Sequence, residues 1–359
     1  MNILYTNFHT GHGGGHTTYV LALLQNPEHN KFVACPPSSR LYKILAERGM
    51  EREGRLIPLQ FPSGLGRLPE TARNTRALIR AIDQHDIDIV HTNGSSDNRM
   101  ALYASPFVKK KFKTVFTKHN TYKVKGAVSL WRLNKFNAAV IFVSGQICKT
   151  IGLDSSNPRY HVIDNCIDLD FWKKNKEIHT GEHLTLVSSA GTARHKGWTY
   201  LVDAIDGLPE AEKKRLSIIL MGRHEPEMED DRPIAATKCD ITYTGFLEDT
   251  RPYLEKGDIG FVLSYKAEAS SFASREMSAM SLPVMISDFP VMRDYVDQSC
   301  GWVTRAQDAE SIRETLRKIL AMPPEELNGM KRAARLKAER EFSIQRMLEA
   351  TNKVYSGII

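Results

Sequence analysis

The sequence predicts an α/β protein with two doubly wound parallel sheets, and three observations carry this prediction. Short apolar runs bounded by polar, Gly or Pro residues alternate with helical patterns, as expected where helices cover both faces of a parallel sheet. The alternation forms two series, separated by a polar stretch at 168–182 that has no periodicity. A length of 359 residues also favours two domains. We therefore expect domains at 1–168 and 169–342.

The first series supplies the N-terminal domain. Its apolar runs predict strands at 2–6, 31–35, 87–92, 113–118, 138–144 and 161–163, and helical patterns between them predict helices at 17–24, 41–48 and 69–84. Residues 128–136 interleave apolar and basic side chains at roughly helical spacing. This pattern fits either an amphipathic helix packed on a core or one that lies on a lipid headgroup layer.

The second series supplies the C-terminal domain. It predicts strands at 184–189, 216–221, 241–244, 259–263 and 284–287, and helices at 198–205, 250–256, 271–279, 309–321 and 324–341. Ligands of open α/β sheets bind at the carboxyl ends of the strands, and clefts between domains are favoured pockets. The loops that lead from strands into helices are therefore the places to search for chemistry.

Composition excludes several classes of protein. Hydrophobic residues make up 42% and charged residues 25% of the chain, which excludes global disorder. No apolar run approaches the ~20 residues that span a bilayer, and the first residues lack the pattern of a signal peptide. The five cysteines are scattered without a C-x-x-C motif, which argues against a disulfide framework or a zinc ribbon. We expect a cytoplasmic protein.

The net charge of +7 hides an asymmetry between the two halves. Residues 1–165 carry a net charge of +11 and the remainder −4, and residues 98–153 contain no acidic residue. A field of one sign attracts polyanions or an anionic membrane surface, whereas a merely soluble face is the simpler interpretation. Peripheral binding at the inner face of the cytoplasmic membrane therefore stays open. The basic residues of this stretch are Arg99, Lys109, Lys110, Lys111, Lys113, Lys118, Lys123, Lys125, Arg132, Lys135 and Lys149.

The loop after the first strand contains Gly13, Gly14 and Gly15 and opens a helix. Glycines let the backbone approach an anion, and the helix N-terminus offers free N–H groups, although a simple tight turn is the alternative. The loop is not G-x-G-x-x-G, which disfavours a nicotinamide dehydrogenase. Its histidines His9, His12 and His16 have no standard metal-ligand spacing, so we do not expect them to bind a metal.

Two basic residues, Arg194 and Lys196, follow a strand and a Gly turn and precede a helix. Arginine contacts phosphate in a bidentate way and lysine acts as a point charge, so the pair could clamp a diphosphate. A solvated basic turn is the alternative interpretation of the same residues.

The sharpest motif is a pair of glutamates, Glu268 and Glu276, which are separated by seven residues after a predicted strand. The small residues between them expose backbone N–H groups at the start of the helix that carries Glu276. A carboxylate can accept hydrogen bonds from both hydroxyls of a ribose, and the adjacent N–H groups can hold phosphate or sugar oxygens. The spacing alone is weak, but Pro283, Val284 and Asp288 follow at suitable positions.

Together these motifs give a sequence that resembles the retaining glycosyltransferases of the GT-B fold, in glycosyltransferase family four (glycosyl transferases group one). The resemblance covers most of the chain and implies two facing Rossmann-like domains, with a helix at 343–359 that returns to the N-terminal domain. Besides the glycine loop and the glutamate pair, it is carried by residues at 88–92, 117–119, 143–144, 162–168, 196–197, 245–246 and 283–284.

The resemblance implies roles for the donor side. Glu276 matches the glutamate that binds the donor ribose, and Glu268 matches the one beside the transferred sugar. Lys196 and Arg194 would neutralise the leaving diphosphate. The loop whose backbone touches sugar and phosphate would comprise Ala269, Ser270 and Ser271.

The resemblance also places residues of the N-terminal domain. His119 matches a histidine near the transferred sugar, so the expected catalytic residues are Glu268, His119 and Lys196. Gly14 and Gly15 would lie near the distal phosphate of the donor. Gly13, His16 and Asn93 are expected on the acceptor side.

The sequence departs from the family pattern at three places. The usual Asn-Gly-Ile-Asp reads Asn165-Cys166-Ile167-Asp168. The usual Gly-Arg pair before the lysine is replaced by Ala190 and Gly191, which makes Arg194 the candidate substitute. The usual Gly-Phe-Gly after the first glutamate reads Ala-Ser-Ser-Phe at 269–272. These departures leave the identity of the donor sugar open.

The implied activity is transfer of a sugar, with retention, from a nucleotide diphosphate sugar such as a UDP-sugar to a glycan or lipid-linked acceptor. Lipopolysaccharide, O-antigen or another surface polysaccharide would be the product. Cations and helix N-termini would stabilise the charge that develops on the diphosphate. We expect no cofactor and no metal, although D-x-D spellings at 86–88 and 168–170 are possible metal motifs.

Two other functions remain open. A nucleotide-sugar epimerase of the same fold would use Glu268 or His119 as its acid or base. A nucleic-acid-binding protein would use the basic stretch at 98–153 and stack its aromatic side chains on bases, but it would leave the glutamate pair unexplained. We expect no nucleic-acid partner.

Overall fold

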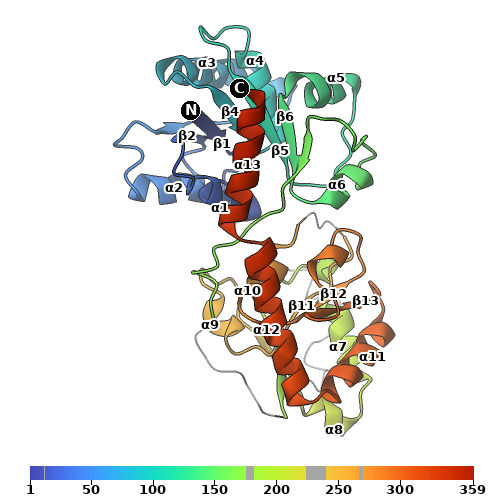
Figure 1. Ribbon diagram of the computed structural model, residues 1–359. Helices are drawn as coiled ribbons and strands as arrows, with labels where there is room; N and C mark the ends of the chain where they lie inside the picture. The colour runs from blue at the N-terminus through green and yellow to red at the C-terminus, as the bar shows by residue number, and fades with distance from the viewer. Residues whose placement is uncertain (12, 175–181, 224–239, 267–269) are drawn as a thin grey trace. The chain divides into compact units, whose positions relative to one another are not determined.

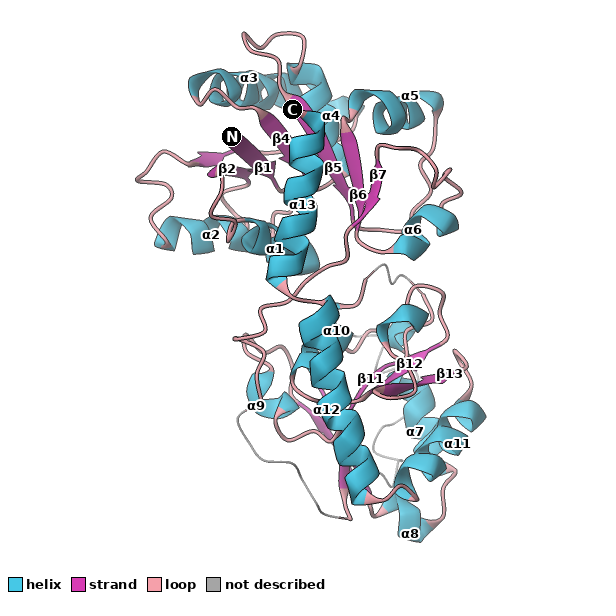
Figure 2. Ribbon diagram, in the orientation of Figure 1, coloured by secondary structure: helices cyan, strands magenta, loops and turns pink. Residues whose placement is uncertain are grey.

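The computed structural model describes the chain except for residues 12, 175–181, 224–239 and 267–269. The chain divides into two compact units (Figure 1). The first comprises Met1–Asn165 and Gln345–Ile359, and the second comprises Cys166–Ile344. Each unit contains a parallel sheet with helices packed against it (Figure 2), so the predicted α/β class is confirmed.

The sheet of the first unit has the strand order β3-β2-β1-β4-β5-β6-β7, and all its pairings are parallel. The chain runs outward from β1 to β3 and then reverses direction at β4, so the switch point of the sheet lies between β1 and β4. Its strands are β1 (Asn2–Thr6), β2 (Asn30–Cys35), β3 (Leu56–Pro58), β4 (Ile89–Thr92), β5 (Lys113–Lys118), β6 (Ala139–Phe142) and β7 (Tyr160–Val162).

Helices connect these strands. They are α1 (Gly14–Leu23), α2 (Arg40–Glu47), α3 (Leu68–Gln84), α4 (Ser95–Ala104), α5 (Ala127–Trp131) and α6 (Gly145–Thr150), with a 3₁₀ turn η1 (Leu65–Arg67) and a π-helical turn η2 (Arg132–Phe136). Central strands such as β4 and β6 are buried along their whole length, as expected for a parallel sheet covered on both faces.

The last helix, α13 (Ile344–Ile358), packs on the first unit although it is far from it in sequence (Figure 1). Asn26 Nδ2 donates to Asn352 Oδ1 (2.6 Å), and the buried His91 hydrogen bonds through Nδ1 with the Tyr355 hydroxyl (2.6 Å). Tyr355 is fully buried. The predicted return of the C-terminal helix to the N-terminal domain is therefore confirmed.

The sheet of the second unit has the order β10-β9-β8-β11-β12-β13, again with parallel pairings, and its switch point lies between β8 and β11. Its strands are β8 (Leu184–Ser188), β9 (Leu216–Leu220), β10 (Asp240–Tyr243), β11 (Ile259–Val262), β12 (Val284–Ser287) and β13 (Gly301–Thr304). Its helical elements are η3 (Arg194–Lys196), α7 (Trp198–Asp206), α8 (Glu210–Lys213), α9 (Arg251–Leu254), α10 (Phe272–Ala279), η6 (Arg293–Tyr295), α11 (Ala309–Leu320) and α12 (Pro324–Glu341).

The segment predicted as one amphipathic helix at 128–136 divides into two parts. In η2, Leu133 is buried and Phe136 packs against the core of the first unit. In α5, Val128 and Trp131 are exposed. Each of the two interpretations of this segment therefore fits one of its parts. None of the helices within the described ranges is both long and apolar enough to cross a membrane.

Candidate functional site

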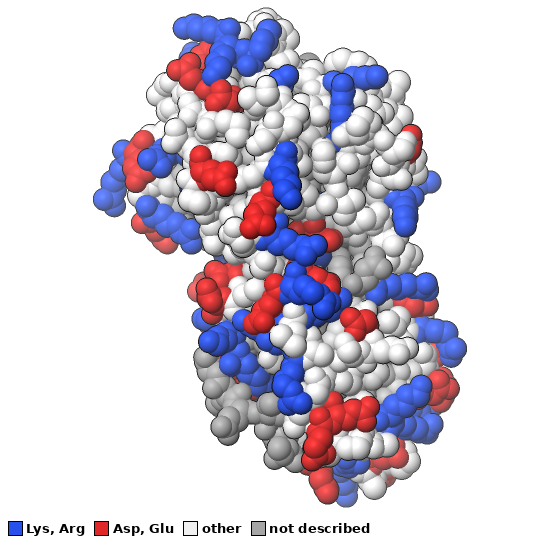
Figure 3. Space-filling view, in the orientation of Figure 1, with Lys and Arg blue, Asp and Glu red and all other residues white. Residues whose placement is uncertain are grey.

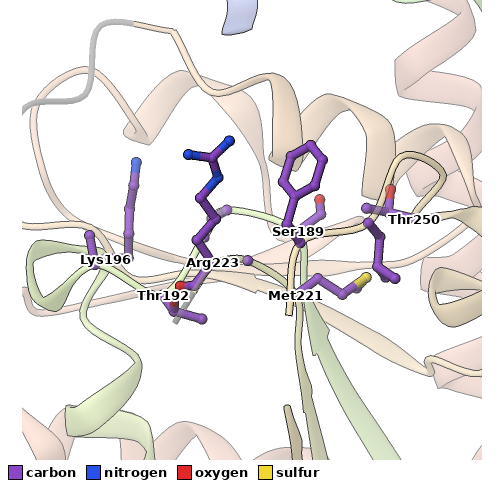
Figure 4. Close-up of a pocket in the computed structure, with 12 residues that line it drawn as sticks. Ser189, Thr192, Lys196, Met221, Arg223 and Thr250 are labelled. Carbon is purple, nitrogen blue, oxygen red and sulfur yellow. Dashed lines mark hydrogen bonds between the residues drawn. The ribbon is translucent and has the colours of Figure 1, made fainter. Parts of the chain in front are cut away.

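The second unit contains a pocket of about 330 Å³ at the carboxyl ends of β8, β9 and β10 (Figure 4). It lies beside the switch point of the sheet, where open α/β folds bind their ligands. The loops that follow these three strands supply its lining. The lining residues are Ser189, Ala190, Gly191, Thr192, Ala193, Lys196, Met221, Gly222, Arg223, Phe246, Leu247 and Thr250.

Main chain from two loops meets closely in this pocket. A Cβ atom on Gly222 would lie 2.8 Å from the Cα of Gly191, so the loop after β9 has no room for a side chain at that point. The loop after β8 is further fixed because Trp198 Nε1 donates to the Thr192 carbonyl (2.8 Å) and Thr192 Oγ1 donates to the Arg223 carbonyl. Small side chains at 189–193 thus leave ordered backbone within reach of a ligand.

Two cations extend into the same region. Figure 4 shows the side chains of Lys196, from η3, and Arg223, which follows β9, pointing in the same direction. The Arg223 guanidinium lies over the Phe246 ring, 5.3 Å from its centroid. Two positive charges beside ordered backbone suit a phosphate-bearing ligand. Arg194 is exposed and is not among the lining residues, whereas Arg223, which the sequence did not single out, is one of them.

Glu276 lies on α10, the helix that follows β11 on the other side of the switch point. Burial raises the pKa of its carboxyl to about 7, and the neighbouring Ser189 hydroxyl acts to lower that pKa. Ser189 also lines the pocket, so Glu276 neighbours one of the lining residues. A carboxyl whose pKa burial has raised to near neutrality is a functional-site signal.

The start of α10 is held by two side chains. Ser271 caps the helix by accepting from the backbone N–H of Ser274 (3.2 Å). The fully buried Arg275 donates from Nη1 to Ser270 Oγ (2.8 Å) and to the Ser271 carbonyl (2.9 Å). The predicted loop residues Ser270 and Ser271 are thus fixed beside Glu276. The predicted residues Glu268 and Ala269 lie outside the described residues.

A second pocket, of about 380 Å³, lies in the first unit at the carboxyl ends of β4 and β5. It adjoins the switch point between β1 and β4, which is the corresponding place in that sheet. The predicted residues His16, Asn93 and His119 all line it. The complete lining is Phe8, His16, Ser63, Asn93, Gly94, Ser95, Ser96, Arg99, Phe116, Thr117, Lys118, His119 and Asn120.

Asn93 joins the two predicted histidines. His119 Nε2 donates to Asn93 Oδ1, His16 Nδ1 donates to the Asn93 carbonyl (3.0 Å), and Asn93 Nδ2 donates to the His16 carbonyl (3.1 Å). The rings of His16 and His119 lie in contact at a tilt of 45°, with centroids 4.2 Å apart, and His9 adds a tilted ring 4.4 Å from that of His16. The result is a rigid row of imidazoles at one wall of the pocket.

These imidazoles are neutral at pH 7. Burial, with repulsion from His9, lowers the pKa of His16 to about 4, and burial with the neighbouring histidines holds the pKa of His119 well below its usual range. A neutral ring whose Nε2 carries the proton presents Nδ1 as an acceptor. In this arrangement His119 can accept and orient a hydroxyl but does not begin as a general acid.

Asp97 supports this wall and was not found from the sequence. Its Oδ2 accepts from Thr6 Oγ1 (2.6 Å) and from the backbone N–H of Asn93 (2.8 Å), and the residue is fully buried. Burial raises the pKa of Asp97 to about 7. Its position at the third residue of α4 is the signal that could have identified it, because acids stabilise the first turn of a helix.

The glycine loop adjoins the same wall. Gly13 precedes α1 with φ of 68°, and a Cβ atom there would lie 2.3 Å from Thr17 Oγ1. Gly14 and Gly15 form the first turn of α1, the turn that also presents His16. The loop therefore lies next to His16, which lines the pocket of the first unit.

The alternative metal motifs do not gather into a site. Asp88 accepts from Lys110 Nζ (2.6 Å) and from the backbone N–H of Asn2 (2.8 Å), so it is part of the fold. Asp168 caps a turn by accepting from the backbone N–H of Phe171 (3.0 Å). Within the described ranges, no three His, Cys, Asp or Glu side chains gather as a metal ion would require. His12 lies outside those ranges.

Comparison with protein-family models gives two matches that follow each other along the chain. Residues 13–171 match Glycosyltransferase Family 4, and residues 182–322 match Glycosyl transferases group 1. Comparison with curated protein sequences gives no significant match.

Solved structures share the fold over nearly the whole chain. HepE from Anabaena in complex with UDP has a TM-score of 0.79 at 15% identity, covering 99% of this chain and 100% of its own. A glycosyltransferase from Rickettsia africae has a TM-score of 0.80 at 18% identity, covering 99% and 98%. Sucrose-phosphate synthase from Thermosynechococcus elongatus has a TM-score of 0.78 at 16% identity, covering 100% and 99%.

The sequence resemblance, the pair of doubly wound sheets and the family matches agree. The family models together span both units, and the similar solved structures have the same two-sheet architecture along their length. The chain therefore belongs to the GT-B glycosyltransferases, with an N-terminal half of glycosyltransferase family 4 and a C-terminal half of glycosyl transferases group 1.

Proposed function

We propose that this glycosyltransferase is a retaining enzyme that takes a sugar from a nucleotide diphosphate sugar, first of all a UDP-sugar. The observation that carries the proposal is the pocket of the second unit, which ordered loop backbone, Lys196 and Arg223 line and where the lining residue Ser189 neighbours the Glu276 carboxyl. A nucleoside diphosphate offers this arrangement a doubly anionic centre and a ribose diol. HepE, which has the same fold, has been solved with UDP and with UDP-glucose.

Cleavage of the bond between sugar and phosphate creates negative charge on the diphosphate. Lys196 and Arg223 stand where they stabilise that charge without reorganising, which is the electrostatic contribution that dominates many enzymes. The backbone N–H groups of the loop after β8 add donors for the same oxygens. Arg223 therefore takes the role that the family resemblance assigned to an arginine before the lysine.

Glu276 is proposed to hold the ribose. An ionised carboxylate accepts from both ribose hydroxyls, and these hydrogen bonds replace the solvation that burial removed. Ser270 and Ser271 are held beside it by Arg275 and would face the diphosphate or the sugar. The roles of Glu268 and Ala269 beside the transferred sugar remain proposals from the family resemblance alone.

The pocket of the first unit is proposed to hold the acceptor. His119 and Asn93 present fixed acceptors and donors to hydroxyl groups, and Arg99 and Lys118 add positive charge for an anionic acceptor. Among the described residues that line the two pockets, none is Asp or Glu, which favours attack from the same face over a covalent intermediate on a lining carboxylate. We propose that no metal is required.

The acceptor is proposed to be a glycan or a lipid-linked intermediate in the synthesis of lipopolysaccharide, O-antigen or another surface polysaccharide. The support is the charge of the first unit, because residues 98–153 are entirely without acid and would attract a phosphorylated or membrane-bound acceptor. This proposal places the enzyme in the cytoplasm at the inner face of the membrane.

The test of the donor is calorimetric titration with UDP and UDP-glucose. We expect Glu276→Ala to weaken UDP affinity about a hundredfold, because two hydrogen bonds to a charged acceptor are lost. Glu325→Ala removes an exposed carboxylate at the start of α12 and is the matched control. Unchanged UDP affinity in Glu276→Ala would refute the assignment of the ribose site.

A further inference from the structure

Helix α5 is apolar in sequence, yet none of its five residues is buried. Its sequence is Ala-Val-Ser-Leu-Trp, so it displays large apolar side chains on the surface. Val128 is 73% exposed and Trp131 52% exposed, and Tyr122 in the preceding loop is 73% exposed. Single exposed apolar residues are ordinary, but several in one short segment mark an interaction surface.

The charge around these side chains has one sign. Lys123 and Lys125 lie between Tyr122 and α5, and both are exposed. Arg132 and Lys135 follow in η2, on the turns after Val128 and Trp131. Figure 3 shows Lys and Arg side chains over α5 on the face it draws. No acidic residue occurs between 98 and 153, so the segment has no local counter-charge in the sequence.

The segment is joined to the acceptor pocket of the same unit. Lys118 lines that pocket, and its Nζ donates to the Tyr122 carbonyl (3.0 Å) and to Asn120 Oδ1 (2.9 Å). The chain leaves β5 at His119 and reaches Tyr122 three residues later. The exposed segment therefore begins at the carboxyl edge of the sheet, where the pocket lies.

We propose that residues 122–135 form a docking surface for an anionic lipid bilayer, with Tyr122, Val128 and Trp131 entering the boundary between headgroups and acyl chains. The inference rests on the proposed function in that it names the surface through which a membrane-bound acceptor is reached. Exposed aromatic and aliphatic side chains flanked by lysine are the pattern of an interfacial helix, and anionic lipid supplies the complementary charge.

A core-packing role does not explain α5. In the adjoining turn η2, the buried Leu133 and the half-buried Phe136 provide the contact with the fold, so the exposed side chains of α5 are left on the outer side. Docking through this surface would hold the lipid-linked end of an acceptor close to Asn120 and Lys118. That placement would favour acceptors presented by the membrane over the same glycan in solution.

The direct test uses the whole chain and vesicles of phosphatidylcholine with or without phosphatidylglycerol. Trp131 is the most exposed of the four tryptophans, so its fluorescence reports insertion. We expect a blue shift and co-sedimentation with phosphatidylglycerol vesicles, and no blue shift in Trp131→Phe. An unchanged spectrum with no co-sedimentation, or equal binding to vesicles of phosphatidylcholine alone, would overturn the proposal.

Matched variants separate this surface from general charge and exposure. Val128→Glu should lower vesicle binding about tenfold or more. Leu336→Glu changes a comparably exposed side chain, 62% accessible, on α12 of the second unit and should not lower it. Replacing Lys123 and Lys125 together by Gln should lower binding about thirtyfold, since each basic residue near an anionic surface contributes about 1 kcal/mol. The control pair Lys109→Gln and Lys111→Gln removes the same charge from the loop before β5.

The outcomes distinguish this inference from the proposed function. Loss of vesicle binding that is equal in the two lysine pairs would show attraction without a docking surface and would overturn the inference. Retention of a duplex oligonucleotide that survives Val128→Glu, without vesicle binding, would replace the bilayer by nucleic acid. UDP binding is measured on the same samples, so its failure would refute the donor assignment and leave vesicle binding to stand or fall separately.

Discussion

The pocket of the second unit is lined by small side chains and loop backbone, whereas the pocket of the first unit is lined by imidazole and amide side chains. Both lie at the carboxyl edge of a parallel sheet beside its switch point, and each contains two cations. In the pocket of the second unit, Lys196 and Arg223 lie beside loop backbone that carries only small side chains. In the other, Arg99 and Lys118 lie beside a row of neutral rings.

One sheet topology can therefore present two chemically different binding surfaces. The loop at 189–193 has side chains small enough for a diphosphate to meet the backbone. The wall formed by His16, Asn93 and His119 offers directional donors and acceptors, which suit hydroxyl groups. The topology decides where the ligands bind, and the local sequence decides which ligand each pocket prefers.

The largest effect expected is that of Lys196→Met. Removal of a preorganised cation beside the leaving diphosphate should lower kcat about 10²- to 10³-fold. Steady-state transfer assays measure this change, with Lys318→Met on the exposed face of α11 as the control. A variant with normal kcat would show that Lys196 is only a surface residue, and the pocket of the second unit would lose its proposed role.

A smaller effect of a different kind is expected from Asn93→Ala. Loss of the bridge between His16 and His119 should misplace the acceptor and lower kcat/KM for the acceptor about ten- to a hundredfold. UDP affinity should not change, because Asn93 lies in the first unit. The control is Asn30→Ala at an exposed position of the same unit. If UDP affinity falls as much as kcat/KM, the division of labour between the pockets is wrong.

The pH dependence of donor binding should belong to the second unit alone. The Glu276 pKa of about 7 lies above its ordinary value of 4.5, and the ribose requires the ionised form, so UDP-glucose affinity should fall about tenfold from pH 8 to pH 6. The pKa of His16, about 4, keeps that ring neutral throughout. Calorimetry at several pH values should give a sloped profile for the native chain and a flat one for Glu276→Gln. A slope retained in Glu276→Gln would assign the titration elsewhere.

The same shift has a consequence for stability. Because the folded-state pKa of Glu276 is raised, the neutral carboxyl favours the folded state, and this contribution is complete below pH 4.5. It is lost as the pH rises through about 7. A bound nucleotide sugar would reverse this trend in the second unit, since it selects the ionised form.

The fold was largely predictable because long apolar runs in a parallel sheet are buried on both faces. Strands such as β5 and β12 were predicted with the bounds that the structure has. The strands β3 and β13 were missed because they are short and lie at the sheet edges, where a Pro58 or a Gly301 interrupts the apolar pattern. Helix α4 was missed because its first turn is polar and its few apolar residues give only a weak helical periodicity in the sequence.

The site was predictable where a local motif carried it. Gly13 before a helix, Lys196 after a strand, and Glu276 on α10 follow from neighbouring residues alone. Arg223 was not predictable in this way, because it comes from the end of a different strand, β9, and only the sheet order brings it to Lys196. Asp97 was hidden for the same reason, since its partners Thr6 and Asn93 follow from the pairing of β1 with β4.

Hydrogen–deuterium exchange of the whole chain with and without UDP shows which unit holds the nucleotide. We expect UDP to slow exchange in the loops at 189–197, 221–223 and 245–250 and at the start of α10. We expect no change at 93–99 or 116–120, which line the pocket of the first unit. Protection confined to those first-unit segments, with none at 189–197, would refute the assignment of the donor to the second unit.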